Sequence, residues 1–350
     1  MDDATAKEIR EQTDAWTAVL EDLPKNHSEV FDFCRDLHET EFVFIGCGTS
    51  YYLSLCAAAV YSGITGEKAR AVTASDVFLY PESIFPQNHK FLGIPISRSG
   101  STTETIWAAK YLKNELHIET LALSCNPKSD LVKISPRSLV AEAAVEASVV
   151  MTKSFTSMLL MIQLLAAAKS RNQKYFANLK ELPAKGRAVI NDFEGIAKQI
   201  AENKELDYFI FLGQGPYYGL ACESMLKMKE MSLSISEAYH SMEFRHGPIS
   251  IIDHHTVVIF LMSDSGREHE TRMLKDVKAL GAKTVVVCER SAPEIKSLAD
   301  YRVELNSGLS DYARLILYMP IMQLLGYHRA IGKGLDPDNP KNLTQVVILE

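Results

Sequence analysis

Short apolar runs of strand length alternate with longer helical patterns through most of this sequence. The runs predict strands at residues 42–45, 91–96 and 120–124. The segments between them predict helices at residues 51–61 and 103–113, and residues 8–20 and 28–37 precede them as helices with polar faces. Because strands that alternate with helices form parallel sheets covered on both faces, this pattern predicts an α/β fold.

The same pattern occurs twice along the chain. Residues 44–48 match residues 211–215, Ser97-Arg-Ser-Gly100 matches Ser263-Asp-Ser-Gly266, and residues 120–124 match 284–288, all at nearly one offset. These ordered matches indicate two copies of one α/β domain, joined near residues 180–200. We expect a helical segment at 1–38, a first α/β domain at 39–180, a second α/β domain at 195–335, and a C-terminal tail at 336–350.

A glycine-rich turn follows the first strand of each copy. In the first copy, Gly46-Cys-Gly48 leads into Thr49 and Ser50, and the loop 97–102 adds four hydroxyl groups and the cation of Arg98. Loops at the carboxyl ends of parallel strands share one edge of the sheet, and free N–H groups at helix N-termini favour anions. We therefore expect a phosphate site in the first copy, with helix capping by these hydroxyls as the alternative.

The second copy does not keep this chemistry. Pro216 and Tyr217 replace the hydroxyl pair, and Asp264 replaces Arg98. Proline lacks an N–H donor and aspartate repels a phosphate. A dinucleotide site is a weaker alternative for the first copy, because Tyr51 stands where the third glycine of G-x-G-x-x-G is required.

Composition and charge narrow the class of protein. Hydrophobic residues make up 47% and charged residues 23% of 350 residues, which is typical of a globular protein with room for two domains. The formal net charge of −7 argues against a nucleic-acid partner. Six cysteines without a C-x-x-C pair, an acidic N-terminus without a signal segment, and no membrane-length apolar run lead us to expect a cytoplasmic protein with reduced thiols.

The segment after Gly215 concentrates ionisable residues. Glu223, Lys227 and Glu230 are spaced to share one face of a helix, among methionines and leucines that predict partial burial. A solvated salt-bridge face is the alternative, but buried charges require partners or a function. His246 precedes Gly-Pro in a turn, where a structural hydrogen bond is the alternative to catalysis. A metal site at Asp253-His254-His255 is weighed against a solvated turn before a predicted strand at residues 257–261, and we expect no metal.

Seven motifs, in the same order along the chain, resemble those of a known family. The motifs are Gly46-Cys-Gly-Thr-Ser50, Ser97-Arg-Ser-Gly100, Met151-Thr-Lys-Ser-Phe155, the Glu223–Glu230 helix, Glu237-Ala-Tyr239, Arg245-His-Gly-Pro248 and Asp336-Pro-Asp-Asn-Pro340. Over residues 40–350 the chain resembles the double sugar isomerase (SIS) family, represented by the isomerase half of glutamine:fructose-6-phosphate aminotransferase. The resemblance implies two tandem SIS domains, each a flavodoxin-like three-layer α/β/α sandwich with a parallel sheet.

The resemblance also implies roles for individual residues. Glu230 would be the base that moves a proton between C1 and C2 of the sugar, and Lys227 would act beside it. His246 would assist ring opening in the neighbouring subunit of a homodimer. The implied substrate contacts are Gly48, Thr49, Ser50, Ser97, Arg98, Ser99, Thr102, Val149, Glu223 and Gln345. The implied partner is a phosphorylated amino sugar, without metal or organic cofactor, nucleic acid or membrane.

Three departures from the aminotransferase matter. Asp2 stands in place of a nucleophilic cysteine, so we expect no glutaminase activity. Arg98 and Met151, where the aminotransferase has glutamine and serine, resemble the SIS-type glucosamine-6-phosphate deaminases. Gln345 stands where the family has a lysine, and a glutamine cannot form a Schiff base, so that ring opening would depend on His246.

These features predict an amino-sugar-phosphate aldose–ketose enzyme that converts glucosamine 6-phosphate to fructose 6-phosphate and ammonia. Two alternatives remain open. A fructosamine-6-phosphate deglycase would use the same Glu230 and His246 and would not need a catalytic lysine. A non-catalytic phosphosugar-binding regulator would bind the sugar without turnover, although residues 1–38 are too short and acidic for a DNA-binding domain.

Overall fold

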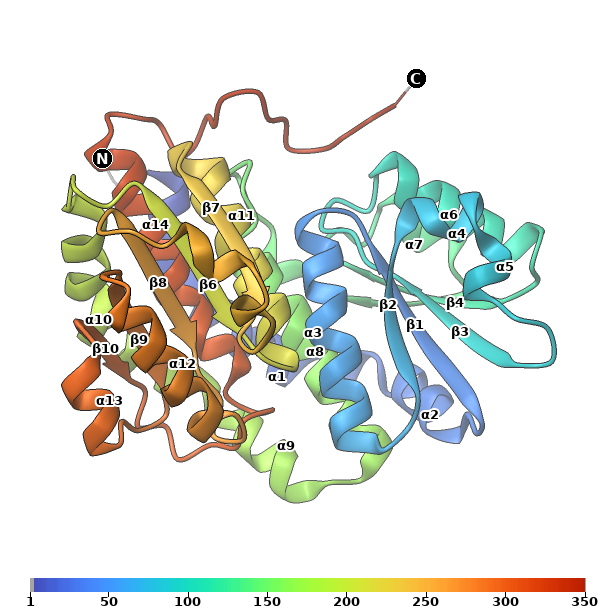
Figure 1. The fold of residues 1–350 in the computed structure, drawn as a ribbon. Coiled ribbons are helices and arrows are strands. Elements are labelled where there is room, and N and C mark those ends of the chain that lie inside the picture. The colour runs from blue at the N-terminus through green and yellow to red at the C-terminus, as the bar shows by residue number, and fades with distance from the viewer. Residues whose placement is uncertain (1–2, 350) are drawn as a thin grey trace. The chain divides into compact units, whose positions relative to one another are not determined.

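The computed structural model describes residues 3–349, and its contacts divide the chain into two compact units. Unit 1 comprises Met1–Arg10 and Ala184–Leu343, and unit 2 comprises Glu11–Pro183 and Thr344–Glu350. Two long helices, α1 (Ala4–Asn26) and α10 (Leu182–Glu202), run across the boundaries between the units. Each unit contains one parallel sheet of five strands flanked by helices, which confirms the predicted fold of two repeated α/β domains (Figure 1).

The sheet of unit 2 has the strand order β2-β1-β3-β4-β5. Its strands are β1 (Thr40–Gly46), β2 (Ala69–Thr73), β3 (Lys90–Pro95), β4 (Glu119–Ser124) and β5 (Arg137–Val140). Its helices are α2 (Ser28–Asp36), α3 (Thr49–Thr65), α4 (Ala74–Leu79), α5 (Pro81–Ile84), α6 (Thr103–Asn114), α7 (Asp130–Ile134), α8 (Lys153–Ser170) and α9 (Gln173–Lys180), with the 3-10 helix η1 (Glu142–Ala144). Helices α3 and α8 lie on one face, and α4, α6 and α7 on the other (Figure 1).

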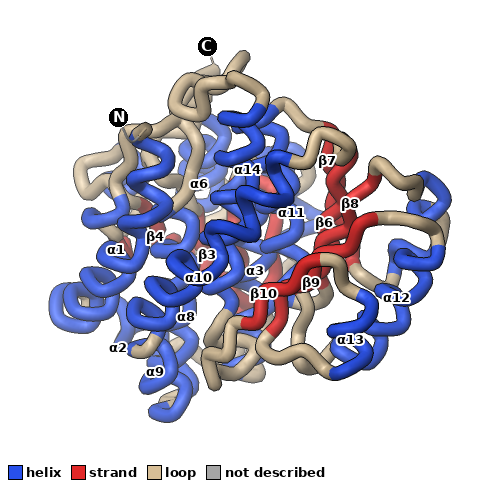
Figure 2. Tube along the Cα trace, turned by 90° about the vertical axis from the view of Figure 1, so that its left-hand side faces the viewer, coloured by secondary structure: helices blue, strands red, loops and turns tan. Residues whose placement is uncertain are grey.

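The sheet of unit 1 has the strand order β10-β9-β8-β6-β7. Its strands are β6 (Tyr208–Gly213), β7 (Ile235–His240), β8 (Thr256–Leu261), β9 (Lys283–Cys288) and β10 (Tyr301–Glu304). Its other helices are α11 (Pro216–Ser232), α12 (Arg267–Ala279), α13 (Pro293–Leu298) and α14 (Met319–Gly332), with the 3-10 helices η2 (Glu243–Arg245), η3 (Pro248–Ile251) and η4 (Leu315–Tyr318). Figure 2 shows α12 and α13 on the opposite face of this sheet from α11 and α14.

The two sheets have the same topology. Read from its other end, the second order is β7-β6-β8-β9-β10, which matches β2-β1-β3-β4-β5 strand for strand. The turns after the first strands also match, because an added Cβ at Gly46 or Gly213 would lie within 2.4 Å of backbone atoms of the following helix. The repeat predicted from the sequence is therefore a repeat of structure.

The strands that the sequence pattern did not reveal are the edge strands. These are β2 and β5 in unit 2 and β7 and β10 in unit 1. The central strands β1, β6 and β8 are almost continuously buried, whereas all five residues of β2 are half-buried. An edge strand has one open side and carries mixed side chains, so it does not give the continuous apolar run that predicts a buried strand.

In each sheet, the next two strands along the chain lie on opposite sides of the first strand. In unit 2 the strands after β1 are β2 on one side and β3 on the other, and in unit 1 β7 and β8 flank β6 in the same way. Such a reversal opens a crevice at the carboxyl ends of the central strands, which is where ligands bind in open α/β sheets. The fold therefore directs attention to the loops after β1 and β3 and to those after β6 and β8.

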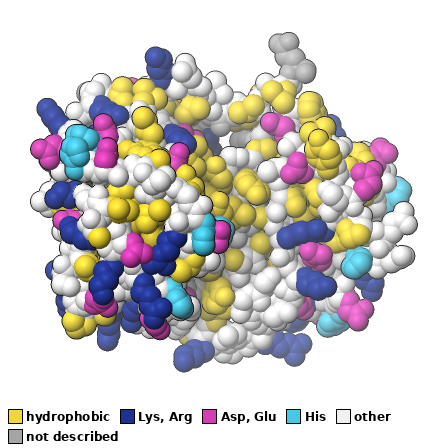
Figure 3. Space-filling model, in the orientation of Figure 1, with side chains coloured by type: hydrophobic (Ala, Val, Ile, Leu, Met, Phe, Trp, Pro, Cys, Tyr) yellow, Lys and Arg dark blue, Asp and Glu magenta, His cyan; other side chains and the backbone are white. Residues whose placement is uncertain are grey.

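The surface charges, the helices and the cysteines of the described residues are those of a globular fold. On the face shown in Figure 3, basic and acidic side chains are interspersed rather than gathered into a patch of one sign. Within residues 3–349, no helix has both the length and the apolar composition needed to cross a membrane. All six cysteines are free, and five of them are buried, with Cys47 half-buried.

Candidate functional site

The loop after β1 brings a hydroxyl pair to the carboxyl edge of the unit 2 sheet. Gly46 packs against the first turn of α3, where an added Cβ would lie 2.4 Å from the carbonyl carbon of Ser50. Gly48 has a φ of 54°, in the left-handed region that favours glycine. Thr49 and Ser50 begin α3 and are buried. The glycines therefore hold two hydroxyl side chains at a helix N-terminus, where an anion is favoured.

The loop after β3 supplies a second group of hydroxyls. β1 and β3 pair in parallel with Ile45 opposite Pro95, so the two loops leave the sheet from neighbouring positions. The Ser97 hydroxyl accepts a hydrogen bond of 3.0 Å from the N–H of Gly100 and lies 3.1 Å from the Thr102 hydroxyl. Both hydroxyl loops thus lie at one edge of one sheet, at the start of α3 and of α6.

Arg98 of the same loop is committed to protein groups. Its guanidinium lies 3.1 Å from Oε2 of Glu146 and donates to the carbonyls of Ser148, at 3.3 Å, and Gln345, at 2.9 Å. Arg98 is 9% exposed and the Glu146 side chain is fully buried. Arg98, which we predicted as a phosphate contact, therefore joins the loop 97–102 to the C-terminal segment.

A cavity of about 570 Å³ lies against this loop. Its lining is Arg98, Ser99, Ser101, Cys125, Asn126, Pro127, Glu142, Val145, Glu146, Gln345 and Val346. It brings together three of the predicted substrate contacts, namely Arg98, Ser99 and Gln345. The other predicted contacts of unit 2 lie outside this lining, and they are Gly48, Thr49, Ser50, Ser97, Thr102 and the half-buried Val149.

Unit 1 contains the predicted acid–base cluster on α11. The ammonium of Lys227 lies 3.2 Å from Oε1 of Glu223 and 2.5 Å from Oε2 of Glu230. Lys227 and Glu223 are buried, whereas 18% of the Glu230 side chain is exposed. Burial opposes the charged form of Lys227, but the two carboxylates outweigh it and raise the pKa of this lysine above its usual value. The cluster is therefore a buried ion triad with one carboxylate at its accessible end.

His246 lies in the connection that follows β7. It comes directly after η2, and its backbone N–H donates to the carbonyl of Glu243 at 2.9 Å. The residue is exposed. The connection after β7 therefore places His246 at the surface of unit 1.

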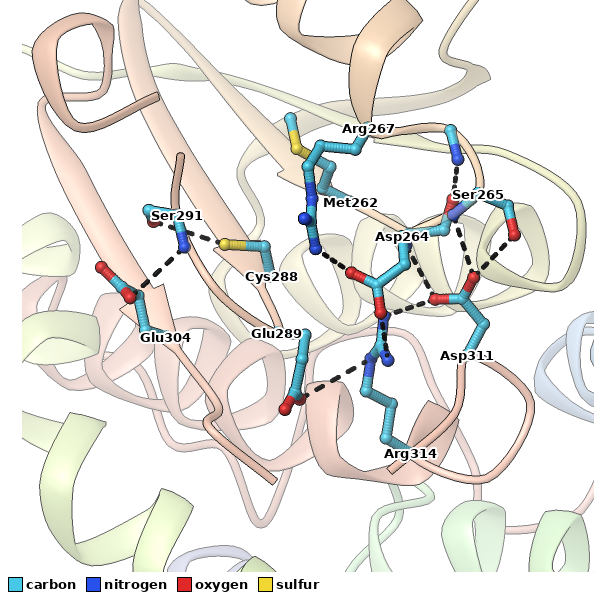
Figure 4. A network of polar contacts seen from close by, with 12 residues as sticks. Met262, Asp264, Ser265, Arg267, Cys288, Glu289, Ser291, Glu304, Asp311 and Arg314 are labelled. Carbon is cyan, nitrogen blue, oxygen red and sulfur yellow. Dashed lines mark hydrogen bonds and ion pairs between the residues drawn. The ribbon is translucent and has the colours of Figure 1, made fainter. Parts of the chain in front are cut away.

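The loop 263–266 of unit 1, which repeats the loop 97–100 of unit 2, holds an internal carboxylate (Figure 4). Asp311 accepts hydrogen bonds from the N–H groups of Asp264, at 2.8 Å, and Ser265, at 3.0 Å, and from the Ser265 hydroxyl at 2.8 Å. The buried Arg314 pairs with Asp311 and lies 2.8 Å from Asp264. Burial raises the pKa of Asp311, but these hydrogen bonds and Arg314 outweigh it, so that the pKa is lowered. A carboxylate of the protein itself therefore occupies this loop.

Sequence reasoning did not find Asp311 or its neighbour Glu270. Glu270 is 1% exposed and accepts from the Ser241 hydroxyl, at 2.7 Å, and the N–H of Ser263, at 3.2 Å. Burial raises its pKa to about 7, against the opposing effect of these two hydrogen bonds. Both carboxylates line a cavity of about 360 Å³ at the carboxyl ends of β6 and β8. Their positions in a helix and a distant loop carry no motif that would have revealed them.

The Asp253-His254-His255 segment forms a turn. Asp253 accepts hydrogen bonds from the N–H of His255 at 2.9 Å and from the hydroxyl of Thr256 at 2.9 Å. Over the described part of the chain, no group of three or more histidine, cysteine, aspartate or glutamate residues is arranged to hold a metal ion. The hydrogen bonds of Asp253 form a turn that leads into β8.

Comparison with known proteins identifies the family. A model of the SIS domain matches residues 38–168 and 207–325, one match in each half of the chain. The chain belongs to the SIS domain family, as its motifs predicted. It is 30% identical over 347 residues to the glutamine–fructose-6-phosphate aminotransferase of Methanothermobacter thermautotrophicus, in a match that covers 98% of this chain and 57% of that protein. The chain therefore spans a little over half the length of this curated relative.

Solved structures with the same fold include enzymes of phosphorylated sugars. The glucosamine-6-phosphate deaminase of Thermotoga maritima is 28% identical, with a TM-score of 0.77 over 99% of this chain and 100% of that one. The C-terminal domain of glucosamine-fructose-6-phosphate aminotransferase from Francisella tularensis is 25% identical, with a TM-score of 0.81 over 97% and 99%. The tagatose-6-phosphate ketose/aldose isomerase of Escherichia coli, at 20% identity and a TM-score of 0.88 over 99% and 96%, shares the fold.

Proposed function

We propose that this protein is an amino-sugar-phosphate aldose–ketose enzyme that converts glucosamine 6-phosphate and water to fructose 6-phosphate and ammonia. The observation that carries the proposal is the buried Glu223–Lys227–Glu230 triad, which presents one carboxylate at its accessible end. A buried charge cluster needs a function or complete pairing, and a carboxylate held by an ammonium is a positioned proton acceptor. The likeness to the Thermotoga deaminase over the whole chain supports this choice of reaction.

Glu230 performs the proton transfers in this proposal. In the open-chain aldehyde, it removes the proton from C2, and the electron pair forms the C1–C2 double bond of an enolamine. The C1 oxygen takes a proton from solvent, and the amino nitrogen returns one to solvent as the imine forms. Return of the proton to C1 gives the 2-imine of fructose 6-phosphate. Water then adds to C2, the C–N bond breaks, and ammonia leaves. Lys227 keeps the Glu230 carboxylate in one position through these steps.

Phosphate binding is assigned to the hydroxyl loops of unit 2. Ser97, Ser99 and Thr102 supply hydroxyl donors beside the start of α6, and Thr49 and Ser50 do so at the start of α3. Helix N-termini suit a dianion, because the helix dipole places partial positive charge there. The corresponding loop of unit 1 holds the Asp311 carboxylate, so the proposal assigns one phosphate to each chain.

His246 assists ring opening, and the proposal assigns it to the site of a second subunit in a homodimer. Its exposed position in the loop after β7 supports this role. The test is co-expression of Glu230→Gln and His246→Gln chains, each inactive alone. Partial recovery of activity in the mixed dimer is expected, and no recovery from a verified mixed dimer contradicts an exchanged histidine.

The function itself is tested by incubating the purified protein with glucosamine 6-phosphate and following ammonia and fructose 6-phosphate together. Equal release of both products is expected from the wild type. Glu230→Gln should abolish release while it retains the fold and the affinity for sugar phosphate, since the amide cannot accept the C2 proton. Absence of both products with a folded wild-type protein would overturn the assignment.

A fructosamine-6-phosphate deglycase is the second candidate. The observation that favours it concerns Gln345, whose amide donates to the carbonyls of Glu146, at 3.1 Å, and Ser148, at 3.4 Å. This side chain supplies no amine for a Schiff base, and the deglycase scheme requires none. Release of glucose 6-phosphate and free amine from a fructosamine 6-phosphate, faster than ammonia from glucosamine 6-phosphate, distinguishes this function from the deaminase.

A further inference from the structure

Glu146 is buried at the start of α8, which it caps. Its Oε1 accepts hydrogen bonds from the N–H groups of Thr152, at 2.7 Å, and Ser154, at 2.9 Å, and from the Thr152 hydroxyl at 3.0 Å. Its Oε2 accepts from the Ser154 hydroxyl at 2.6 Å. A carboxylate at a helix N-terminus satisfies free N–H groups and the positive end of the helix dipole. Glu146 is therefore fixed to a helix that is buried from Ser154 to Ala167.

The same carboxylate reaches the loop 97–102 through Arg98. Oε2 of Glu146 lies 3.1 Å from the guanidinium of Arg98, which also donates to the carbonyl of Gln345 at 2.9 Å. Capping α8 alone needs only a short polar side chain. A buried ion pair contributes little net stability because desolvation offsets the attraction. The Glu146–Arg98 pair is therefore better explained as a link between α8 and the loop 97–102.

The C-terminal segment is attached to this structure at a second place. The carbonyl of Val347 accepts from the N–H of Thr103 at 3.3 Å, and the N–H of Leu349 donates to the Thr103 hydroxyl at 3.0 Å. Thr103 is the first residue of α6 and directly follows the loop 97–102. Residues 345–349 therefore lie along the hydroxyl loop, held by Arg98 at one end and Thr103 at the other.

We propose that Glu146 is a positioning residue, which acts through Arg98 to hold the loop 97–102 and the C-terminal segment 344–349 in the arrangement that binds a sugar phosphate. This role deepens the proposed function and rests on it, since the ligand is the phosphorylated sugar assigned to that loop. Arg98 is then a connector between α8, the loop and the C-terminal segment.

The test compares Glu146→Gln with the wild type in three measurements. Hydrogen exchange of the ligand-free protein should become roughly tenfold faster or more in peptides that cover 97–102 and 343–349, because the charged link to Arg98 is weakened. The dissociation constants for inorganic phosphate and glucosamine 6-phosphate should rise roughly tenfold to a hundredfold. KM should rise similarly, with kcat changed much less, because the chemistry belongs to other residues.

Glu119→Gln is the matched control. It removes a charge from another glutamate–arginine pair of unit 2, in which the exposed Glu119 lies 3.6 Å from the half-buried Arg137. A pair whose carboxylate is exposed to solvent contributes roughly 0–1 kcal/mol, and neither exchange nor phosphate affinity should change. If Glu146→Gln does not fold, Arg98→Lys keeps the charge, removes the forked geometry, and should give the same loosening of both segments.

Unchanged exchange and unchanged phosphate affinity in folded Glu146→Gln and Arg98→Lys would overturn the positioning role. The exchange measurement uses no ligand and the binding measurement uses inorganic phosphate. Both therefore remain informative if the wild type fails to convert glucosamine 6-phosphate, a result that would overturn the proposed function alone.

Discussion

The ammonium group of Lys227 lies 2.5 Å from the carboxylate of Glu230, one helical turn further along α11. The lysine is buried and also faces Glu223, so two carboxylates share one cation. The arrangement holds Glu230 in place and leaves part of its carboxylate accessible.

Replacement of Lys227 by methionine should be strongly destabilising. The substitution keeps much of the side-chain volume but removes the cation that faces two carboxylates, one of them fully buried. Removing one partner of a buried ion pair costs about 3–5 kcal/mol of unfolding free energy. Urea denaturation at pH 7 measures the loss. Lys229→Met, on the exposed face of the same helix, should change the unfolding free energy by less than about 0.5 kcal/mol, and equal losses in both variants would contradict the triad.

Ser97→Ala and Ser263→Ala form a matched pair for the phosphate assignment. Each serine hydroxyl accepts from the N–H of a glycine three residues later, Gly100 at 3.0 Å and Gly266 at 2.8 Å. Both variants lose the same internal hydrogen bond, but only Ser97 belongs to the proposed phosphate loop. Titration calorimetry with glucosamine 6-phosphate should show a roughly tenfold to hundredfold weaker affinity for Ser97→Ala, because the variant loses one hydrogen bond to a charged phosphate. Ser263→Ala should bind as the wild type does, and an equal effect of the two substitutions would argue against the assignment.

Glu270 should make the stability of the protein depend on pH in the neutral range. Burial raises its pKa from 4.5 to about 7, so the folded state holds the proton more tightly than the unfolded chain. The unfolding free energy that Glu270 contributes is fully present below about pH 4.5. It is lost as the pH rises through about 7, at up to about 1.4 kcal/mol per pH unit.

Glu270→Gln should remove that slope, as measured by urea unfolding between pH 5 and 8. The amide approximates the shape of the protonated acid and does not ionise. Glu268→Gln, at an exposed position of the same helix, should leave the slope as it is in the wild type. Parallel stability curves for wild type and Glu270→Gln would show that Glu270 is not the group responsible.

Part of the fold could be read from the sequence because burial leaves a local signature. The central strands β1, β3 and β4 and their repeats are enclosed on both sides, so their residues form short apolar runs. The edge strand β7 contains Glu237, Tyr239 and His240, and its strand structure depends on pairing with β6, which a local pattern does not reveal. The helical spacing of Glu223, Lys227 and Glu230 likewise placed these residues on one face before their contacts were known.

The sequence by itself determined the duplicated α/β architecture, the two hydroxyl loops and the charged face of α11, because each depends on neighbours along the chain. Only the tertiary structure decided which polar groups meet across long separations. Arg98 joins Glu146 and the backbone of Gln345, and Asp311 fills the loop of Asp264. Such contacts depend on where the fold brings distant segments together, and a buried charge is stabilised by whichever partner lies there.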